Sequence, residues 1–241
     1  MYAEDLLSQE QNGFRRNGST TDNIFIMQQI LEKCYEYNIK MHVLFIDFKQ
    51  AFDSVDRQKT IQILQELRLP NKLIRLIEMT LQNTEASVKI ENLTSKPFST
   101  SSGVHQGDPL SVTIFNLILE SVIKKLILRG NICLKLKQIV AYADDVALLT
   151  RSLKALKEIF HKLQNEATLV GLNINKDKTK YMQINRTGTK DLSHLKINNF
   201  AFENVANFNY LCSILNADNK MNIEIAERIV KGNKVFMLMQ N

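Results

Sequence analysis

Glycine and proline are scarce in this chain, with only 8 and 3 residues among 241. So few flexible and turn-forming residues argue against a long disordered linker. The sequence also lacks tandem repeats and low-complexity tracts, which excludes a repeat architecture. No apolar run approaches the roughly 20 residues that cross a bilayer, and no signal peptide is recognisable. What remains is an ordinary globular composition, 44% hydrophobic and 23% charged, long enough for one large domain or two small ones.

Cysteine is scarce as well. Cys34, Cys133 and Cys212 lie far apart in the sequence and form no Cys-x-x-Cys pair. An odd, scattered set of this kind favours a reducing compartment and argues against a zinc site. We therefore expect an intracellular protein, in the nucleus or the cytoplasm, that is neither secreted nor held in a membrane. The sequence does not define its oligomeric state.

Acidic residues are under-represented only in the C-terminal part of the chain. Residues 1–150 carry equal numbers of basic and acidic side chains, so the whole net charge of +6 lies in residues 151–241. A basic segment suits a polyanionic partner such as nucleic acid, although a solvated lysine-rich surface gives the same count.

Two adjacent aspartates, Asp144 and Asp145, stand inside an apolar, β-favouring segment that spans Ile139–Leu149. Strand interiors normally exclude neighbouring carboxylates, because unpaired charge is costly to bury and like charges repel. A tight turn between two short strands, with divalent cations nearby, makes such a pair tolerable. The segment therefore predicts a metal site at a hairpin turn.

The remaining pattern predicts strands separated by helices, which indicates an α+β fold with an antiparallel sheet packed on helices. Apolar spacing and capping residues predict helices over about 21–37, 57–67, 70–82, 110–129, 152–170 and 219–239. Strands are predicted over 42–48, 132–141, 146–150, 180–185, 194–198 and 207–212, with a hairpin over 86–102.

A third carboxylate, Asp47, ends the first predicted strand. If this strand neighbours the hairpin, Asp47 converges with Asp144 and Asp145 on one sheet edge. Hard oxygen ligands of this kind suit Mg²⁺, which accepts substrate phosphate oxygens as further ligands. Two such ions, about 4 Å apart, activate an attacking hydroxyl and stabilise a leaving pyrophosphate. Asp53 and Asp56 follow in the next turn, and we expect them to cap a helix or to lie in solvent.

Six segments stand in order along roughly residues 11–215, namely Gln11–Thr20, Phe45–Val55, Ser102–Ser111, Tyr142–Asp145, Gly171–Lys180 and Phe208–Cys212. In this order they resemble the fingers segment, motifs A, B, C and D, and the primer grip of the reverse transcriptases of non-LTR (LINE-type) retrotransposons. The order and spacing of several motifs carry more weight than any single one.

The resemblance implies a right-hand polymerase palm with RNA-directed DNA polymerase activity. Its partners would be an RNA template, a DNA primer and dNTPs. Asp47 and Asp144 would bind two Mg²⁺ ions, or Mn²⁺ in their place, and Asp145 would complete the acidic cluster. Lys178 would stand beside the leaving pyrophosphate as general acid or electrostatic stabiliser, with Lys176 and Lys180 as rival candidates.

The resemblance also implies which residues bind the substrates. The Phe48 carbonyl would face the triphosphate. Phe52 would act as a sugar gate that clashes with a ribose 2′-OH, although an ordinary core role is the alternative. Gln106 and Gly107 would line the nucleotide and template pocket. The primer backbone would contact Tyr210 and Leu211.

A few positions depart from the family pattern. His105 stands where a permanently charged Arg or Lys is usual, which weakens a phosphate or template contact at neutral pH. Cys212 replaces a frequent Gly in the primer grip, and this side chain would stiffen or shift a tight turn. Arg15 and Arg16 are candidates for phosphate contacts, with an ordinary surface role as the alternative.

The resemblance divides the chain into three parts. Residues 1–40 would be partial fingers, 41–215 the palm with finger-type helices inserted at about 57–83, and 216–241 the start of a thumb or a C-terminal helix. The family's polymerases carry more fingers and a helical thumb, so we expect a core taken from a larger protein, or a decayed genomic copy.

Three alternatives stay open. The chain could be a catalytically silent remnant that at most binds nucleic acid. It could be an RNA-directed RNA polymerase, although Phe52 and the Tyr-Ala-Asp-Asp sequence, in place of Gly-Asp-Asp, favour DNA synthesis. It could also be a group II intron maturase, although Phe45–Val55 matches the LINE type better.

Overall fold

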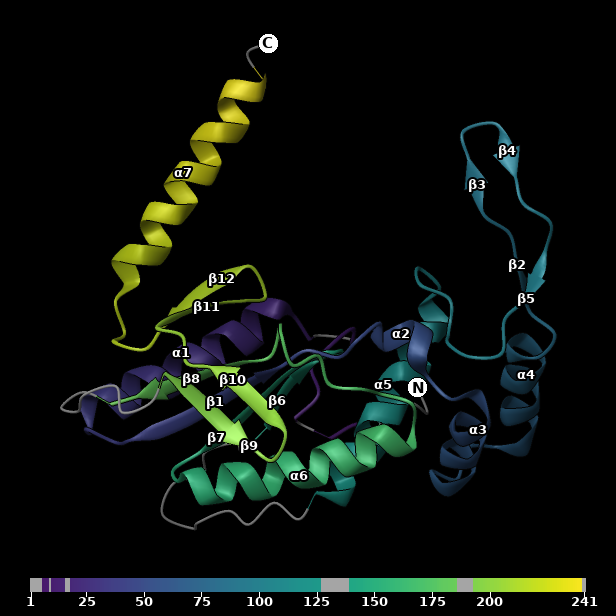
Figure 1. Ribbon diagram of the computed structural model, residues 1–241, viewed down its shortest axis with the longest axis horizontal. Coiled ribbons are helices and arrows are strands. Elements are labelled where there is room, and N and C mark those ends of the chain that lie inside the picture. Colours follow the sequence, from purple (N-terminus) through teal and green to yellow (C-terminus); the bar gives the residue numbers. More distant parts are fainter. Residues whose placement is uncertain (1–5, 9, 16–17, 127–138, 186–192, 240–241) are drawn as a thin grey trace.

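A four-stranded antiparallel sheet lies at the centre of the fold, in the strand order β6-β7-β1-β8 (Figure 1). The computed structural model describes residues 6–8, 10–15, 18–126, 139–185 and 193–239. The four strands are β1 (Met41–Ile46), β6 (Ile139–Tyr142), β7 (Asp145–Thr150) and β8 (Lys180–Ile184).

Helices flank the sheet, and several begin at residues that are typical N-caps. The side chains of Ser19, Asp56, Asp108 and Ser152 each accept a hydrogen bond from a backbone N–H in the first turn of the helix that they precede. The helices are α1 (Thr20–Glu36), α2 (Ala51–Ser54), α3 (Arg57–Glu66), α4 (Asn71–Leu81), α5 (Pro109–Lys125), α6 (Leu153–Leu169) and α7 (Met221–Met239).

The central strand β1 is buried along its whole length, which explains its uninterrupted apolar run. Leu44 and Ile46 belong to the core that the sheet forms with α5 and α6. Val43 and Phe45 belong to a second core on the opposite face, formed with α1 and with a hairpin of two short strands, β11 (Asn207–Tyr210) and β12 (Ser213–Asn216). The sheet is therefore the middle of three layers, with α6 along one face and α1 along the other (Figure 1).

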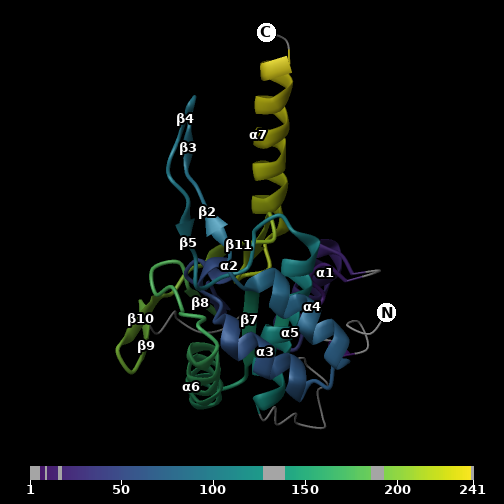
Figure 2. The same ribbon diagram turned by 90° about the vertical axis from the view of Figure 1, so that its right-hand side faces the viewer.

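Two elements extend away from these layers, as Figures 1 and 2 show. One is α7, and the other is a long hairpin built from two short ladders. In the described part of the chain, no helix is both long and apolar enough to span a bilayer. The remaining strands are β2 (Glu85–Ala86), β3 (Lys89–Ile90), β4 (Leu93–Thr94), β5 (Phe98–Ser99), β9 (His194–Ile197) and β10 (Phe200–Glu203).

The predicted α+β class and the predicted helices are confirmed, with ends that shift by a few residues. Residues 127–138, which contain the end of one predicted helix and most of one predicted strand, lie outside the described residues. The strand predicted over 207–212 ends early, at Tyr210. Its last two residues, Leu211 and Cys212, have φ of 48° and 66° and form a two-residue turn that leads into β12. Helix α2 and strands β10 and β12 were not predicted.

Candidate active site

Strand pairing brings the three predicted carboxylates to one end of the sheet. Ile46 at the end of β1 pairs with Val146 near the start of β7, and Tyr142 pairs with Asp145 across the β6–β7 turn. Asp47 therefore follows β1 at the same edge where the turn carries Asp144 and Asp145. The convergence expected from the sequence is present in the structure.

This edge is electrostatically crowded. Loss of hydration, together with the nearby charges of Asp144 and Asp47, raises the pKa of Asp145 to about 6. Loss of hydration also raises the pKa of Asp144, with a further contribution from Asp47. The Oδ2 atom of Asp47 is buried without a hydrogen-bond partner among the described residues. A negative cluster with an unpartnered buried oxygen is what a bound cation would stabilise.

The donor set fits a hard divalent cation, because it consists of carboxylate oxygens. As the side chains stand, however, no three His, Cys, Asp or Glu residues in the described ranges are close enough to hold one ion together. The site therefore presents the right ligand chemistry without a group of three protein ligands, and an ion bound by one or two of these carboxylates would take its other ligands from water or substrate phosphate.

The segment that resembles motif D lies beside Asp47. Phe48 forms an isolated antiparallel bridge with Ile174, and the Asn175 N–H donates to the Asp47 carbonyl at 2.8 Å. The buried Thr179 hydroxyl accepts a hydrogen bond from the Asp47 N–H at 3.2 Å. These contacts fix the backbone of Asp47, while the Phe48 side chain is buried in the core.

The three candidate lysines of this segment differ in their surroundings. Lys180 forms an ion pair with Glu203 at 2.7 Å, which occupies its ammonium group. Lys176 and Lys178 are exposed. The ion pair makes Lys180 a weaker candidate for the contact with the pyrophosphate. The role of Lys178 beside the pyrophosphate stays a prediction.

A cavity of about 900 Å³ opens beside Asp144, within the range of roughly 300–1,000 Å³ typical of small-molecule sites. Phe52, Gln106 and Gly107, for which the family resemblance implies contacts with the nucleotide, all line it. Phe52 is half-buried and stacks on Phe115 with 4.6 Å between ring centroids. Phe52 thus packs against the core and also lines the cavity, and its role as a sugar gate stays a prediction. The full lining is Phe14, Arg15, Phe52, Gln106, Gly107, Asp108, Pro109, Val112, Thr113 and Asp144.

Gly107 is required by backbone conformation. Its φ is +91°, in the region that side chains disfavour. A Cβ at this position would have no described atom within 4 Å, so close packing inside the protein does not explain the glycine. Asp108 follows as the N-cap of α5, its carboxylate accepting from the Leu110 N–H at 3.0 Å.

The hairpin formed by β11 and β12, which contains the predicted primer-grip residues, lies on the sheet face that carries α1. Phe208 stacks on Phe45 with 4.0 Å between ring centroids and an interplanar angle of 11°. Tyr210 is buried, and its hydroxyl accepts a hydrogen bond from Asn23 at 3.4 Å. Burial raises the pKa of Tyr210 above its usual range. The more accessible positions at this turn are Leu211 and Cys212.

Sequence reasoning missed a set of buried polar side chains next to the β6–β7 turn, namely Gln11, Asn23 and Asn116. The Asn23 side-chain amide donates to the Ala141 carbonyl at 3.0 Å as well as to Tyr210, so it joins β6 to the β11–β12 hairpin. Gln11 contacts the turn itself. Nothing in the local sequence distinguishes these side chains from ordinary exposed polar residues. The one indication was that Gln11 lies in the segment Gln11–Thr20, which resembles the fingers segment of the family.

Comparison with known proteins agrees with this geometry. The family model described as "Reverse transcriptase (RNA-dependent DNA polymerase)" matches residues 1–215. The chain is 25% identical, over 170 residues, to the retrovirus-related Pol polyprotein from the type-2 retrotransposable element R2DM of Drosophila melanogaster, which covers 70% of this chain and 16% of that protein. It is 25% identical over 211 residues to the RNA-directed DNA polymerase from mobile element jockey of Drosophila funebris, covering 85% of this chain and 23% of that protein.

Solved structures show the same fold. The apo telomerase of Candida tropicalis, truncated from its C-terminal domain, superposes with a TM-score of 0.59 at 14% identity, over 86% of this chain and 41% of that one. Telomerase from Candida albicans, in complex with a fragment of telomeric RNA, gives a TM-score of 0.55 at 17% identity, over 88% and 36%. The chain thus spans less than half of these proteins. The ordered motifs, the palm-like sheet and the family match agree, and the chain belongs to the reverse transcriptase (RNA-dependent DNA polymerase) family.

Proposed function

We propose that this chain is the core of an RNA-directed DNA polymerase of a retrotransposon, which adds deoxynucleotides to a primer 3′-OH on an RNA template. The observation that carries the proposal is the meeting of Asp47, Asp144 and Asp145 at one sheet edge, beside the cavity that Phe52, Gln106 and Gly107 line. The RNA-directed DNA polymerase named among the relatives, and the telomeric RNA in a related structure, support this choice of template and product.

Asp47 and Asp144 are proposed to hold two Mg²⁺ ions, with Mn²⁺ as a substitute, and Asp145 to complete the cluster. Bound there, the ions would lower the pKa of the primer hydroxyl and stabilise the leaving pyrophosphate. The unpartnered Oδ2 of Asp47 and the raised pKa values of Asp144 and Asp145 support these ligands. Asp47 keeps its backbone position through its contacts with Asn175 and Thr179.

The cavity residues are proposed to select the nucleotide. Phe52 is held against Phe115, so its ring can exclude a ribose 2′-OH without moving aside. Gln106 and Gly107 would contact the nucleotide and template, and the Phe48 carbonyl would face the triphosphate. Lys178 is proposed to neutralise the pyrophosphate, and Tyr210 and Leu211 to set the primer position.

The division into partial fingers (1–40), palm (41–215) and the start of a thumb or C-terminal helix (216–241) belongs to the same proposal. Helices α3 and α4 fall in the part assigned to inserted finger-type helices. Helix α7, which extends from the body of the molecule (Figure 2), begins the last part.

Primer extension on an RNA template tests the function. The chain is expected to extend a DNA primer with dNTPs and Mg²⁺, to use rNTPs far less, and to lose extension in Asp144→Asn. Mg²⁺-dependent dNTP binding that disappears in Asp144→Asn supports the site even where extension is slow. Salt-sensitive RNA binding without metal-dependent nucleotide binding would instead identify a catalytically silent remnant.

A further inference from the structure

Ala143, in the turn that joins β6 to β7, has an unfavourable backbone conformation. Ala143 lies between Tyr142 and Asp144 with φ of 50°, a left-handed value that costs an L-residue roughly 1–2 kcal/mol. Ala143 is also buried, at 2% exposure. Such a conformation persists only where its surroundings hold it, and it fixes the direction in which Asp144 and Asp145 leave the turn.

The side-chain amide of Gln11 holds Ala143 on both sides. The Ala143 N–H donates to Gln11 Oε1 at 2.9 Å, and Gln11 Nε2 donates to the Ala143 carbonyl at 3.4 Å. The same Oε1 accepts from the Gly13 N–H at 2.9 Å. Gln11 is fully buried. One amide therefore satisfies the donor and the acceptor of the residue that precedes Asp144.

The backbone around Gln11 is fixed to the edge of the sheet. Gln11 forms a parallel bridge with Ala141, flanked by hydrogen bonds from the Ala141 N–H to the Glu10 carbonyl (2.8 Å) and from the Asn12 N–H to the Ala141 carbonyl (3.0 Å). Residues 10–12 therefore lie beside β6, paired with it through a single bridge.

Gly13 brings the same segment into close contact with the turn. A Cβ on Gly13 would lie 2.2 Å from the Ala143 nitrogen, so no side chain fits there. The Asn116 side-chain amide of α5 donates to the Gly13 carbonyl at 2.7 Å, and the Phe14 ring lies 5.6 Å from the ring of Tyr142. The turn is therefore confined by the backbone of this segment as well as by Gln11.

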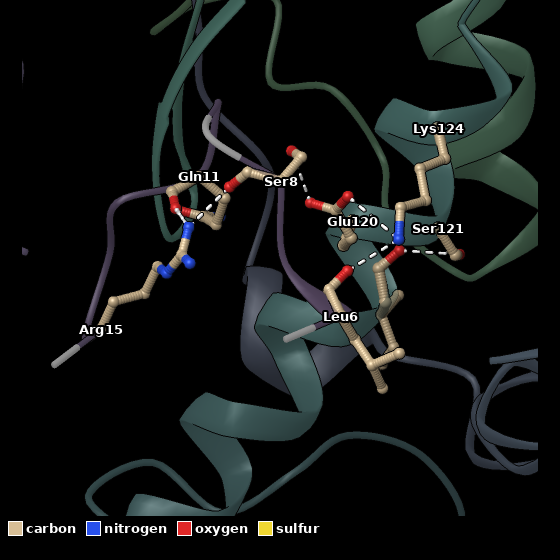
Figure 3. Close-up of polar contacts among 8 residues, drawn as sticks. Leu6, Ser8, Gln11, Arg15, Glu120, Ser121 and Lys124 are labelled. Carbon is tan, nitrogen blue, oxygen red and sulfur yellow. Dashed lines mark hydrogen bonds and ion pairs between the residues drawn. The ribbon is translucent and has the colours of Figure 1, made fainter. Parts of the chain in front are cut away.

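Further contacts tie the segment to α5 (Figure 3). Arg15 Nη1 donates to the carbonyls of Ser8 (2.6 Å) and Gln11 (3.1 Å), which closes the segment into a loop. Ser8 Oγ donates to the buried Glu120 Oε2 at 2.9 Å, and Lys124 Nζ donates to the Leu6 carbonyl at 2.7 Å. Gln11 therefore stands on a support that is anchored at several points.

We propose that Gln11 is a positioning residue for Asp144 and Asp145. This inference rests on the proposed polymerase function. In it, Gln11 holds Ala143 in the conformation that directs both carboxylates toward the metals and the reacting phosphate. Gln11 touches neither substrate nor metal in this role, because it acts through the backbone of Ala143. Supporting groups of this kind typically change metal affinity or activity by roughly 10–100-fold.

The test compares two Gln→Met variants of the full chain. Gln11→Met keeps the length of the side chain and removes both hydrogen bonds to Ala143. Gln183→Met is the matched control, because Gln183 is also buried in this sheet but pairs with His42, at the opposite end of β1. Three quantities are measured: hydrogen exchange of the Ala143 N–H by NMR, the affinity for Mn²⁺ alone, and kcat and KM for dNTP in primer extension.

Gln11→Met is expected to speed exchange of the Ala143 N–H by at least about 10-fold and to weaken Mn²⁺ binding by roughly 10–100-fold. Its kcat is expected to fall by a similar factor, while KM for dNTP changes by less than about 3-fold, since the pocket residues are untouched. Gln183→Met is expected to match the wild-type chain in all three. A folded Gln11→Met with wild-type Mn²⁺ affinity and kcat would overturn the proposal.

The outcomes separate this proposal from the proposed function. If the wild-type chain binds Mn²⁺ but extends no primer, the polymerase function fails, and the exchange and Mn²⁺ measurements still decide whether Gln11 positions the carboxylates. If Gln11→Met does not fold, Gly13→Ala provides the second variant, because its methyl group must displace the Ala143 nitrogen. Wild-type Mn²⁺ affinity in a folded Gly13→Ala would then overturn the proposal.

Discussion

Buried polar groups lie at both ends of strand β1, and their surroundings differ. Near its start, His42 Nδ1 lies 2.6 Å from the Tyr181 hydroxyl, and burial, with a smaller effect of Lys40, lowers the pKa of His42 to about 4. After its end, Asp47 has a buried oxygen with no hydrogen-bond partner in the described part of the chain, and the charge of Asp47 helps to raise the pKa of Asp145 to about 6. The first end is neutral and hydrogen-bonded, whereas the second is charged and repulsive.

The difference separates what stabilises this fold from what is proposed to catalyse. A buried polar group adds stability when its partner is supplied by the chain, as Tyr181 supplies one for His42. A carboxylate cluster without a cation reduces the stability of the fold. A bound cation would relieve this repulsion, and the relief would contribute to the affinity for the proposed metals. The two ends should therefore respond oppositely to substitution and to pH.

The largest expected effect is at the acidic end. Asp144→Asn should reduce single-turnover primer extension by at least about 10³-fold, because metal stabilisation of several kcal/mol is lost. The thermal midpoint of the same variant should be unchanged or higher, since a repulsive charge is removed. A variant that lost stability together with activity would break the comparison.

The next effect is the pH dependence set by His42. Its folded pKa of about 4 lies below the unfolded value of 6.5, so the unfolded chain binds the proton first. The His42 contribution to stability is complete above pH 6.5 and is lost as the pH falls toward 4, by roughly 3 kcal/mol in total. Urea unfolding between these pH values should show this loss in wild-type chain and not in His42→Gln, which cannot take up a proton. Equal pH slopes in the two chains would refute the assignment.

Removing the partner of His42 should cost less. Tyr181→Phe leaves the imidazole nitrogen without the Tyr181 hydroxyl, so the free energy of unfolding should fall by roughly 1–3 kcal/mol. Tyr37→Phe is the control, because Tyr37 is exposed and its substitution should stay within about 0.5 kcal/mol of wild type. Equal effects of the two substitutions would show that the hydroxyl of Tyr181 adds nothing.

The smallest expected effect is a gain in stability at Asp145. Its folded pKa of about 6 lies above the unfolded value of 3.8, so its charge opposes folding above pH 6. The residue is exposed, and solvent screens part of this cost. Asp145→Asn should raise the thermal midpoint by roughly 2–4 °C at pH 7.5, the shift that about 1 kcal/mol gives in a domain of this size. The gain should vanish at pH 3.5, and a gain that persists there would point to another cause.

The sequence predicted the three carboxylates at the acidic end better than it predicted the residues that hold the turn in place. Three carboxylates could be placed together because Asp47 follows an uninterrupted apolar strand and Asp144 stands at a hairpin turn, and antiparallel pairing then determines the rest. The helices were predictable because N-caps such as Ser19 and Asp56 act within four residues. Local patterns of this kind are visible in one dimension.

The role of Gln11 was not predictable, because it depends on a contact with a residue 132 positions away. Strand β12 was missed for a related reason. Its four residues carry no alternation of polar and apolar side chains, and it exists because the turn at Leu211 and Cys212 returns the chain along β11. Helix α2, with four residues, is too short for a helical period to appear.

The stack between Phe45 and Phe208 has a consequence for repeated rounds of synthesis. Phe45 lies in β1, two residues before Asp47, which follows the strand, and Phe208 lies in the hairpin proposed to contact the primer. The Phe45 ring is buried and the Phe208 ring is half-buried, and this close, nearly parallel stack resists sliding, so in the proposed function the hairpin and the acidic edge would keep one spacing between nucleotide additions. In the proposed function, advancing by one nucleotide would then be a movement of the duplex over the fixed hairpin and acidic edge, with the length of each step determined by the nucleic acid.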